Sequence, residues 1–186
     1  MPSWSRIATR MRVPLGFVFA AAYFWFARPA WAWIAAGCVL IMAGIFVRAM
    51  ASGHIRKNRE LTTTGPYAYT RNPLYLGSVL IAAGFVIAAR NPWIAVAALA
   101  MFLVVYVPVI RAEEKYLDSA FPGYAEYAAH VPRLLPRLGP HRSPAAGDDS
   151  GSFSRELYLK HREYNAALGS ALMIGALILK MVLVQH

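Results

Sequence analysis

The chain alternates between apolar stretches and short, strongly polar connections. Five apolar runs stand out, at Val13–Phe26, Ala30–Val47, Leu74–Ala89, Trp93–Ile110 and Ala166–Val184. A helix needs about 20 apolar residues to cross a bilayer, so the first and third runs are short. Interfacial tyrosine, tryptophan and arginine at their ends could extend them, and burial in a protein core is the alternative. The pattern predicts an all-α, polytopic membrane protein with about five membrane helices.

Two of the connections are tight turns. "ARP" at 27–29 joins the first two runs, and "ARNPW" at 89–93 joins the third and fourth, so each pair is expected to form a helical hairpin. The sequence complexity gathers instead in the connections at 48–73 and 111–163. That distribution favours a single site on one side of the membrane, although a small scaffold with long loops would look the same.

Composition and charge support this interpretation and add an orientation. Hydrophobic residues make up 58% of the 186 positions, the mean hydropathy is +0.42 and the net charge is +10. Arginine and lysine are concentrated before the first run and in the two complex connections, whereas the opposite connections carry only Arg28 and Arg90. The positive-inside rule then predicts a cytosolic N-terminus and a cytosolic site. Nucleic-acid binding would also explain basic charge, but the sequence has no recognition motif for it, so no nucleic-acid partner is expected.

Metal or disulfide chemistry has no support in the sequence. Cys38 is the only cysteine, and the five histidines are scattered without the spacing of a metal site, so we expect no metal. The N-terminus has the charge of a signal sequence, but "FWFARPAWAW" is bulky where small cleavage-site residues are expected. We therefore expect a retained anchor.

The chain divides by composition into four segments. Residues 1–50 are expected to form the N-terminal transmembrane hairpin, 51–138 the catalytic core, 139–152 a flexible Gly/Pro/Ser-rich linker, and 153–186 one long helix with an amphipathic start and a membrane run. In that last segment Ala167, Ala171 and Gly175 recur every four residues, a pattern that permits close helix packing in lipid. Lys180 near its end is expected to snorkel toward the interface.

The connection "TTTGPYAYTRNPLYLG", residues 62–77, contains the first candidate chemistry. Asn72 is a favoured N-cap and Pro73 a favoured first helical residue, so the third helix is expected to begin at Pro73. Tyrosines are common at membrane interfaces, which is one explanation of their number here. The other is a binding site, because a helix N-terminus beside Arg71 suits an anionic group such as the carboxylate of a cofactor.

The second candidate feature is an acidic pair, Glu113 and Glu114, just past the fourth run. If the helix ended there, two carboxylates would lie unfavourably at its negative end. If it continues to Ser119, Arg111 and Lys115 screen them, and "FPG" at 121–123 ends it. A solvated helix face and a functional pair both fit this pattern. The prolines that follow, at 132 and 136, are expected to hold the next segment rigid.

Together, "GPYAYTRNPLYLG" and "EEKYLDSAFPGYAEYAAHVPRLLP" resemble the isoprenylcysteine carboxyl methyltransferase and phospholipid methyltransferase group. These are integral membrane enzymes that use S-adenosylmethionine. The resemblance covers about residues 60–136 and rests on two motifs in the right order. The family's RHP motif appears as "RNP", which removes a titratable ring, and its FG appears as "FPG". Sterol reductases that use NADPH share a similar acidic and tyrosine-rich tail, but not the first motif.

The resemblance implies a cofactor pocket and its residues. The cofactor-binding candidates are Tyr67, Arg71, Asn72, Pro73, Tyr75, Gly77, Glu113 and Glu114. Arg133 is the catalytic candidate, orienting an acceptor carboxylate, with a lipid-facing arginine as the alternative. The predicted function is methyl transfer from S-adenosylmethionine to a lipophilic acceptor, most simply a carboxylate of the isoprenylcysteine type. A phospholipid N-methyltransferase, an NADPH-dependent sterol-type reductase and a non-catalytic scaffold are the rival predictions. The acceptor, the oligomeric state and the role of the last helix are left open.

Overall fold

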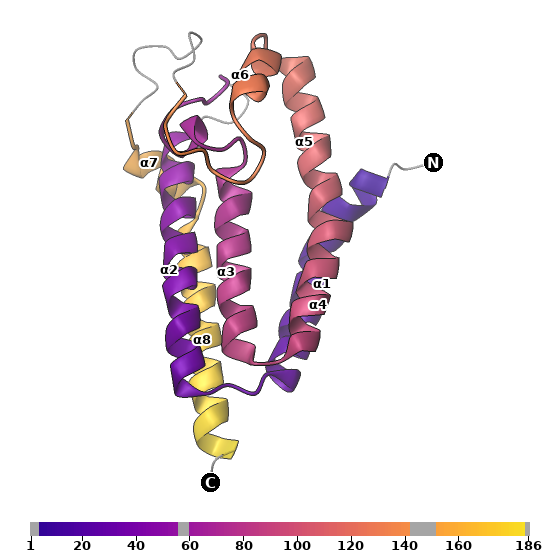
Figure 1. The fold of residues 1–186 in the computed structure, drawn as a ribbon, viewed down its shortest axis with the longest axis vertical. Coiled ribbons are helices and arrows are strands. Elements are labelled where there is room, and N and C mark those ends of the chain that lie inside the picture. Colours follow the sequence, from indigo (N-terminus) through magenta and orange to yellow (C-terminus); the bar gives the residue numbers. More distant parts are fainter. Residues whose placement is uncertain (1–3, 56–59, 142–151, 185–186) are drawn as a thin grey trace. The chain divides into compact units, whose positions relative to one another are not determined.

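The computed structural model describes residues 4–55, 60–141 and 152–184, and every regular element within them is helical. The long helices are α1 Trp4–Phe26, α2 Trp31–His54, α3 Pro73–Ala89, α4 Pro92–Met101, α5 Val107–Ala120 and α8 Tyr164–Val184 (Figure 1). The short ones are η1 Gly65–Ala68, the π-helical η2 Phe102–Tyr106, α6 Tyr124–His130 and α7 Arg155–Lys160. Most of the predicted linker at 139–152 lies outside the described residues. The predicted all-α fold class is confirmed.

Among the residues that the structure describes, three helical stretches are long and apolar enough to cross a membrane. They are Trp31–His54, Pro92–Ala120 and Tyr164–Leu183. Two shorter apolar helices, Val13–Phe26 and Pro73–Ala89, correspond to the two runs that the sequence marks as short. Third-helix initiation at Pro73 is also as predicted, and α5 continues to Ala120, so Glu113 and Glu114 lie within a helix and not at its end.

A π-helical segment interrupts the fourth membrane run. η2 joins α4 to α5, and Pro108 is the second residue of α5. Proline lacks an N–H and its ring collides with the carbonyl four residues earlier in a regular helix. We attribute the wider turn to this proline, because π-bulges are a common way for a helix to absorb such a local defect. The bulge shifts the helical register that leads to Glu113 and Glu114.

The chain forms two compact units. The first contains Met1–Ile41, Ala82–Lys115 and Ser170–His186, and the second contains Met42–Ile81 and Tyr116–Gly169. The limits fall inside α2, α3, α5 and α8, so each unit draws on parts of the same helices.

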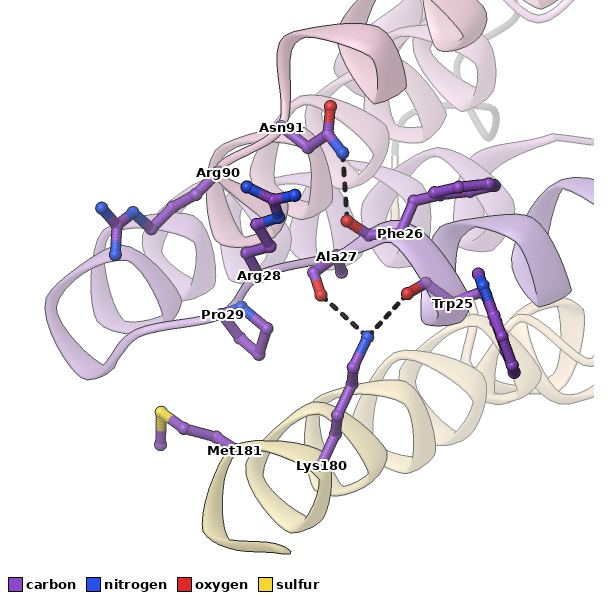
Figure 2. Close-up of a pocket in the computed structure, with 9 residues that line it drawn as sticks. All are labelled: Trp25, Phe26, Ala27, Arg28, Pro29, Arg90, Asn91, Lys180 and Met181. Atoms are coloured by element: carbon purple, nitrogen blue, oxygen red, sulfur yellow. Dashed lines mark hydrogen bonds between the residues drawn. The ribbon is translucent and has the colours of Figure 1, made fainter. Parts of the chain in front are cut away.

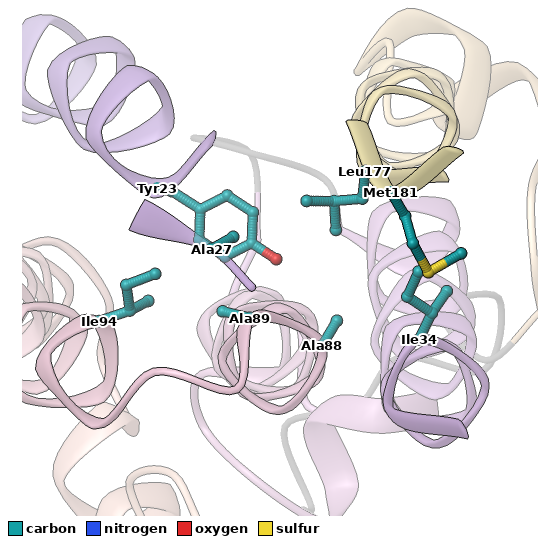
Figure 3. Packing of buried hydrophobic residues seen from close by; sticks show 8 residues of the cluster. All are labelled: Tyr23, Ala27, Ile34, Ala88, Ala89, Ile94, Leu177 and Met181. Carbon is teal, nitrogen blue, oxygen red and sulfur yellow. The ribbon is translucent and has the colours of Figure 1, made fainter. Parts of the chain in front are cut away.

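The core of the first unit contains residues from one end of five helices (Figure 3). Tyr23 and Ala27 from α1, Ala88 and Ala89 from α3, Ile94 from α4, and Leu177 and Met181 from α8 are buried together with Ile34 of α2. The Tyr23 hydroxyl donates a hydrogen bond to the Phe85 carbonyl, at 2.9 Å, which satisfies the one polar group in this cluster. In the same unit Gly37 and Gly84 meet so closely that a Cβ on Gly84 would lie 2.5 Å from the Gly37 carbonyl oxygen.

The second unit repeats this close approach of α2 and α3. A Cβ on Gly44 would lie 2.5 Å from the carbonyl oxygen of Gly77, and one on Gly77 would meet the Arg48 side chain. Around α6, a separate cluster buries Tyr124, Tyr127 and Val131, with Leu61 and Leu117 packed against it. This second cluster supports the connection that contains the first motif.

The C-terminal segment differs from the single long helix that the sequence predicts. α7 ends at Lys160 and α8 begins at Tyr164, with Arg162 between them at a φ of 53°. The turn brings the His161 ring nitrogen Nδ1 to 3.2 Å from the Ser52 carbonyl oxygen. The small-residue stripe does not make the close packing that it permits, because Ala171 and Gly175 are exposed and nothing lies within 4 Å of a Cβ built on Gly175.

Lys180 also differs from its expected snorkelling role. Its ammonium group donates to three carbonyl oxygens at the C-terminal end of α1: Phe24 at 2.6 Å, Trp25 at 2.9 Å and Ala27 at 2.8 Å. The last carbonyls of a helix have no partner within it, and a cation at that end is favoured by the helix dipole. Lys180 therefore caps α1 from α8.

Candidate functional site

The loop that contains the first motif begins with a sharp turn at Gly65. This glycine has a φ of 59°, and a Cβ built on it would fall 2.4 Å from the His54 ring at the end of α2. Glycine is thus required here by both the backbone and the close contact. The 3₁₀ turn η1 follows and buries Tyr67 and Ala68 before the chain enters α3.

The segment after α6 is hydrogen-bonded to this loop along most of its length. The backbone N–H groups of Arg71, Arg137 and His141 donate to the carbonyls of Pro132, Tyr69 and Ala68, at 2.9, 3.0 and 2.9 Å. Proline-rich segments cannot satisfy their own backbone groups through a helix, so the loop provides the partners. We call residues 131–141 the tail, and its rigid attachment agrees with the expectation from Pro132 and Pro136.

Two side chains of the loop strengthen this attachment. The Thr70 hydroxyl is buried and lies 3.4, 3.2 and 3.1 Å from the carbonyl oxygens of Pro132, Arg133 and Leu134. The Asn72 amide donates to the Arg133 carbonyl oxygen at 2.9 Å. The residue that stands in place of the family's histidine therefore ties the loop to the tail.

The tyrosines of α6 complete the contact. The Tyr127 hydroxyl donates to the Tyr67 carbonyl oxygen at 2.7 Å. Burial and the neighbouring Tyr124 raise the pKa of Tyr127 well above its ordinary value, and the nearby Arg71 lowers that pKa only partly. Tyr127 is therefore neutral and available as a donor at physiological pH, and Arg71 lies close enough to act on it electrostatically.

The remaining candidates of the first motif are distributed along the start of α3. Pro73 is fully buried and Tyr75 is half-buried, both in the first turn. Gly77 is buried against Gly44 and Arg48, so helix packing alone gives it a structural role. The structure thus brings Tyr67, Arg71 and Asn72 together with the tail, and places Gly77 on the side of α3 that contacts α2.

The acidic pair belongs to the other unit. Glu113 and Glu114 lie on α5 within the first unit, where Glu113 is exposed and Glu114 is buried, with 8% of its surface accessible. An ionised carboxylate is costly to bury without compensating charges or hydrogen bonds. Glu114 is thus the buried member of the pair, and its role in the cofactor pocket stays a prediction.

Arg133, the catalytic candidate, has an exposed side chain on a fixed backbone. Its carbonyl oxygen accepts hydrogen bonds from both Thr70 and Asn72. The backbone position of this arginine is thus determined by the loop, and its role toward an acceptor stays a prediction.

An ion pair lies beside the first motif, and the sequence analysis did not predict it. Arg48 of α2 binds the Glu163 carboxylate through Nη2 at 2.7 Å and Nε at 2.9 Å. Its Nη1 donates to the Leu74 carbonyl and to the Ser78 hydroxyl, at 3.2 and 2.5 Å. The sequence contains an indication of this pair: an arginine at the end of one apolar run and a glutamate just before another. Charged residues at such positions in membrane proteins usually pair with each other.

Comparison with known proteins identifies the family. The model of the phospholipid methyltransferase family matches residues 30–123, about half of the chain. The chain belongs to the phospholipid methyltransferase family. The matched region includes the loop, the α3–α4 hairpin and the acidic pair, so the resemblance that the motifs suggested is confirmed.

Individual relatives of this family member differ in their named roles. The chain is 37% identical over 142 residues to a cobalt-zinc-cadmium resistance protein of Cupriavidus metallidurans, covering 70% of this chain and 64% of the relative. It is 36% identical over 103 residues to a nickel-cobalt-cadmium resistance protein of Alcaligenes xylosoxydans, covering 55% and 48%. It is 33% identical over 108 residues to the protein-S-isoprenylcysteine O-methyltransferase of Saccharomyces cerevisiae, covering 51% and 45%.

The chain thus spans less than two thirds of the length of each of these relatives. No solved structure matches it. Among the described residues of this phospholipid methyltransferase family member, no three His, Cys, Asp or Glu side chains gather in a group that could hold a metal ion.

Proposed function

We propose that the chain is an integral membrane methyltransferase that uses S-adenosylmethionine and methylates a lipophilic acceptor. One observation carries the proposal: the loop, which contains the first motif, is hydrogen-bonded through Arg71, Asn72 and the Tyr67 carbonyl to the last part of the second motif, in α6 and the tail. Segments about sixty residues apart that assemble into one rigid support suit a common ligand. Family membership and the relative from Saccharomyces cerevisiae point to the same chemistry.

The candidate residues fit the chemical groups of this cofactor. Arg71 and the N-terminal turn of α3 would hold its carboxylate, since cations and helix N-termini bind anions. The buried Glu114 would hold its ammonium group or ribose hydroxyls. Tyr67 and Tyr75 would cover the adenine. When bound, the cofactor supplies a methyl group on a positively charged sulfonium, and the role of the protein residues is to align the acceptor with it.

The acceptor we propose is a lipid-borne carboxylate of the isoprenylcysteine type. A carboxylate oxygen can form the new C–O bond as the S–CH₃ bond breaks, with no proton to remove, so no general base is needed. Arg133 would orient that carboxylate from the fixed backbone of the tail. A phospholipid amine is the second candidate acceptor, because the matching family is described by phospholipid methylation. We also propose, from the distribution of arginine and lysine, that the site faces the cytosol.

Calorimetric titration of the purified protein with S-adenosylhomocysteine and, separately, with NADPH tests the cofactor. We expect S-adenosylhomocysteine to bind and NADPH not to bind. Binding of NADPH alone would favour the reductase, and binding of neither would favour a non-catalytic scaffold. Transfer of a radiolabelled methyl group to farnesylated cysteine, compared with transfer to phosphatidylethanolamine vesicles, then distinguishes the two acceptors.

Two variants test the cofactor pocket. Because a hydrogen bond to a charged group contributes about 1.5–3 kcal/mol, Arg71→Ala and Glu114→Ala should each weaken S-adenosylhomocysteine binding by roughly 10- to 100-fold. The matched controls are Arg155→Ala and Glu126→Ala, which remove exposed charges of the same sign elsewhere. Unchanged affinity in both pocket variants, with monodisperse protein by size exclusion, would refute the residue assignment.

A further inference from the structure

A cavity of about 460 Å³ lies within the first unit, among residues that the candidate site does not use (Figure 2). It is bordered by the end of α1, the connection to α2, the turn between α3 and α4, and α8. Its lining residues are Trp25, Phe26, Ala27, Arg28, Pro29, Arg90, Asn91, Lys180 and Met181. Three of these nine residues are cations, and none is acidic.

The frame of the cavity is held by hydrogen bonds. The Asn91 side chain accepts from the Trp93 N–H at 3.0 Å, which caps α4, and donates to the Phe26 carbonyl oxygen at 3.0 Å. The Arg28 N–H donates to the Ala89 carbonyl oxygen at 2.8 Å. Lys180 is committed to the carbonyls of α1, as described above. The walls are therefore fixed without a ligand, which lowers the entropic cost of binding one.

The two arginines are left to act on a ligand. Within the part of the chain that the structure describes, the Arg28 guanidinium makes no hydrogen bond or ion pair, and the Arg90 guanidinium lies 5.8 Å from the centre of the Trp33 ring. α2 begins at Trp31 and α4 at Pro92, so two helix N-termini add positive partial charge at this end of the unit. Guanidinium groups suit phosphate because they can donate two parallel hydrogen bonds to it.

The backbone at Arg90 provides an independent indication. This residue follows the last residue of α3 and has a φ of 51°, in the left-handed region where glycine is usual after a helix. A non-glycine residue there costs on the order of 1 kcal/mol. Arg90 thus combines a backbone conformation that favours glycine with a place in the lining of the cavity, although Figure 2 shows its guanidinium turned toward the outside.

The aromatic surroundings indicate where the anion comes from. Trp25 and Phe26 line the cavity, and Trp25 and nearby Trp93 are 78% and 77% exposed. Exposed tryptophans mark the level of lipid headgroups in membrane proteins. A phosphate at this level, beside apolar rings that can contact glycerol and acyl carbons, belongs most naturally to a lipid.

We propose that this cavity binds a phosphate group carried by an anionic lipid headgroup, with Arg28 and Arg90 as its ligands. The site is separate from the proposed cofactor loop and does not depend on methyl transfer. It would fix the turns of both hairpins to the headgroup layer.

Native mass spectrometry of the full chain in detergent can test this proposal. The probes are dioleoylphosphatidylglycerol, dioleoylphosphatidylcholine and inorganic phosphate. We expect phosphatidylglycerol to bind at least about 10-fold more tightly than phosphatidylcholine, with an affinity that falls as salt is added because Arg28 and Arg90 are both exposed. Arg28→Ala/Arg90→Ala should remove this preference, and Arg28→Lys/Arg90→Lys should restore part of it.

The control pair Arg10→Ala/Arg155→Ala removes the same charge from exposed positions outside the cavity and should keep the preference. An equal loss in both pairs would mean general charge attraction and would overturn the site. Binding of inorganic phosphate without any preference for the lipid would overturn the lipid as the source of the anion. Size exclusion establishes that each variant is folded, and the lysine pair keeps the test decisive if the alanine pair fails to fold.

Discussion

Single residues in this protein act mainly by joining distant parts of the chain. Thr70, Asn72 and Tyr127 each bond a backbone carbonyl about sixty residues away, and none of these bonds follows from local sequence. Asn72 shows the difference between what the local sequence predicts and what only the tertiary structure reveals. Its position before Pro73 predicts the start of α3 correctly, whereas its amide contact with Arg133 depends on a fold that brings the tail back to the loop.

The Arg48–Glu163 ion pair gives a test at this scale. The two side chains are 23% and 13% exposed, so breaking the pair leaves a poorly solvated charge. We expect Glu163→Gln and Arg48→Gln each to lower the free energy of unfolding by about 1–3 kcal/mol. The double variant should lose less than the sum of the two, which a double-mutant cycle in detergent would measure.

Exposed residues provide the control for that cycle. Glu156→Gln and Arg155→Gln change the same residue types on the exposed surface of α7 and should shift stability by less than about 0.5 kcal/mol. Additive losses in the Arg48 and Glu163 cycle would mean that the two side chains do not stabilise the fold as a pair.

At the scale of elements, α2 and α3 are matched by glycines seven residues apart on each helix. Gly37 meets Gly84, and Gly44 meets Gly77, so α2 and α3 run antiparallel along this contact. Small residues let helix backbones approach closely in a membrane, where helices gain packing energy in place of a hydrophobic effect. This spacing is visible in the sequence, but the small residues at 167, 171 and 175 look equally suitable and are not used in this way.

Gly84→Leu tests the packing of α3 against α2. Its Cβ would lie 2.5 Å from a backbone oxygen that cannot move aside, so we expect a loss of about 1–3 kcal/mol of stability, measured as a lower midpoint of thermal unfolding. Gly175→Leu is the matched control, because a Cβ there has no neighbour within 4 Å. A similar loss of stability in both variants would mean that replacing any glycine in these helices has this effect, and that the contact between Gly84 and Gly37 is not its cause.

The helices themselves were largely predictable, and the breaks in them were not. Apolar runs and capping residues define α1 to α4, because hydrophobicity and helix starts are local properties. The turn at Arg162 and the π segment before Pro108 depend on contacts and on register, which a pattern of apolar residues does not report. The sequence shows the two motifs of the candidate site. It does not show the hydrogen bonds between loop and tail, because these join residues that only the tertiary structure brings together.

At the scale of the whole molecule, the two proposed binding sites involve different residues. The second unit contains the joined loop and tail, and the first contains both the acidic pair and the arginine-lined cavity. The residues proposed for the lipid site all lie within the first unit. Variants at Arg28 and Arg90 should therefore change lipid binding without changing S-adenosylhomocysteine affinity.

Lys180→Met tests how the last helix contributes to the whole. Three backbone carbonyls at the end of α1 would lose a charged donor, and we expect a loss of about 1–3 kcal/mol, seen as a lower unfolding temperature. Lys180→Arg keeps a cation at this position and should lose less stability than Lys180→Met. If Lys180→Met is as stable as the parent protein, α8 does not act as a cap for α1.

The same lysine imposes an order on biosynthesis. Lys180 is made more than 150 residues after the carbonyls that it binds, so a nascent chain has α1 in the membrane long before that helix end is satisfied. The end of α1 is then capped only once α8 has been synthesised and inserted. We expect chains that lack this cap to expose the end of α1 to membrane proteases. Pulse–chase labelling should show Lys180→Met turning over faster than the parent chain; equal half-lives would exclude this checkpoint.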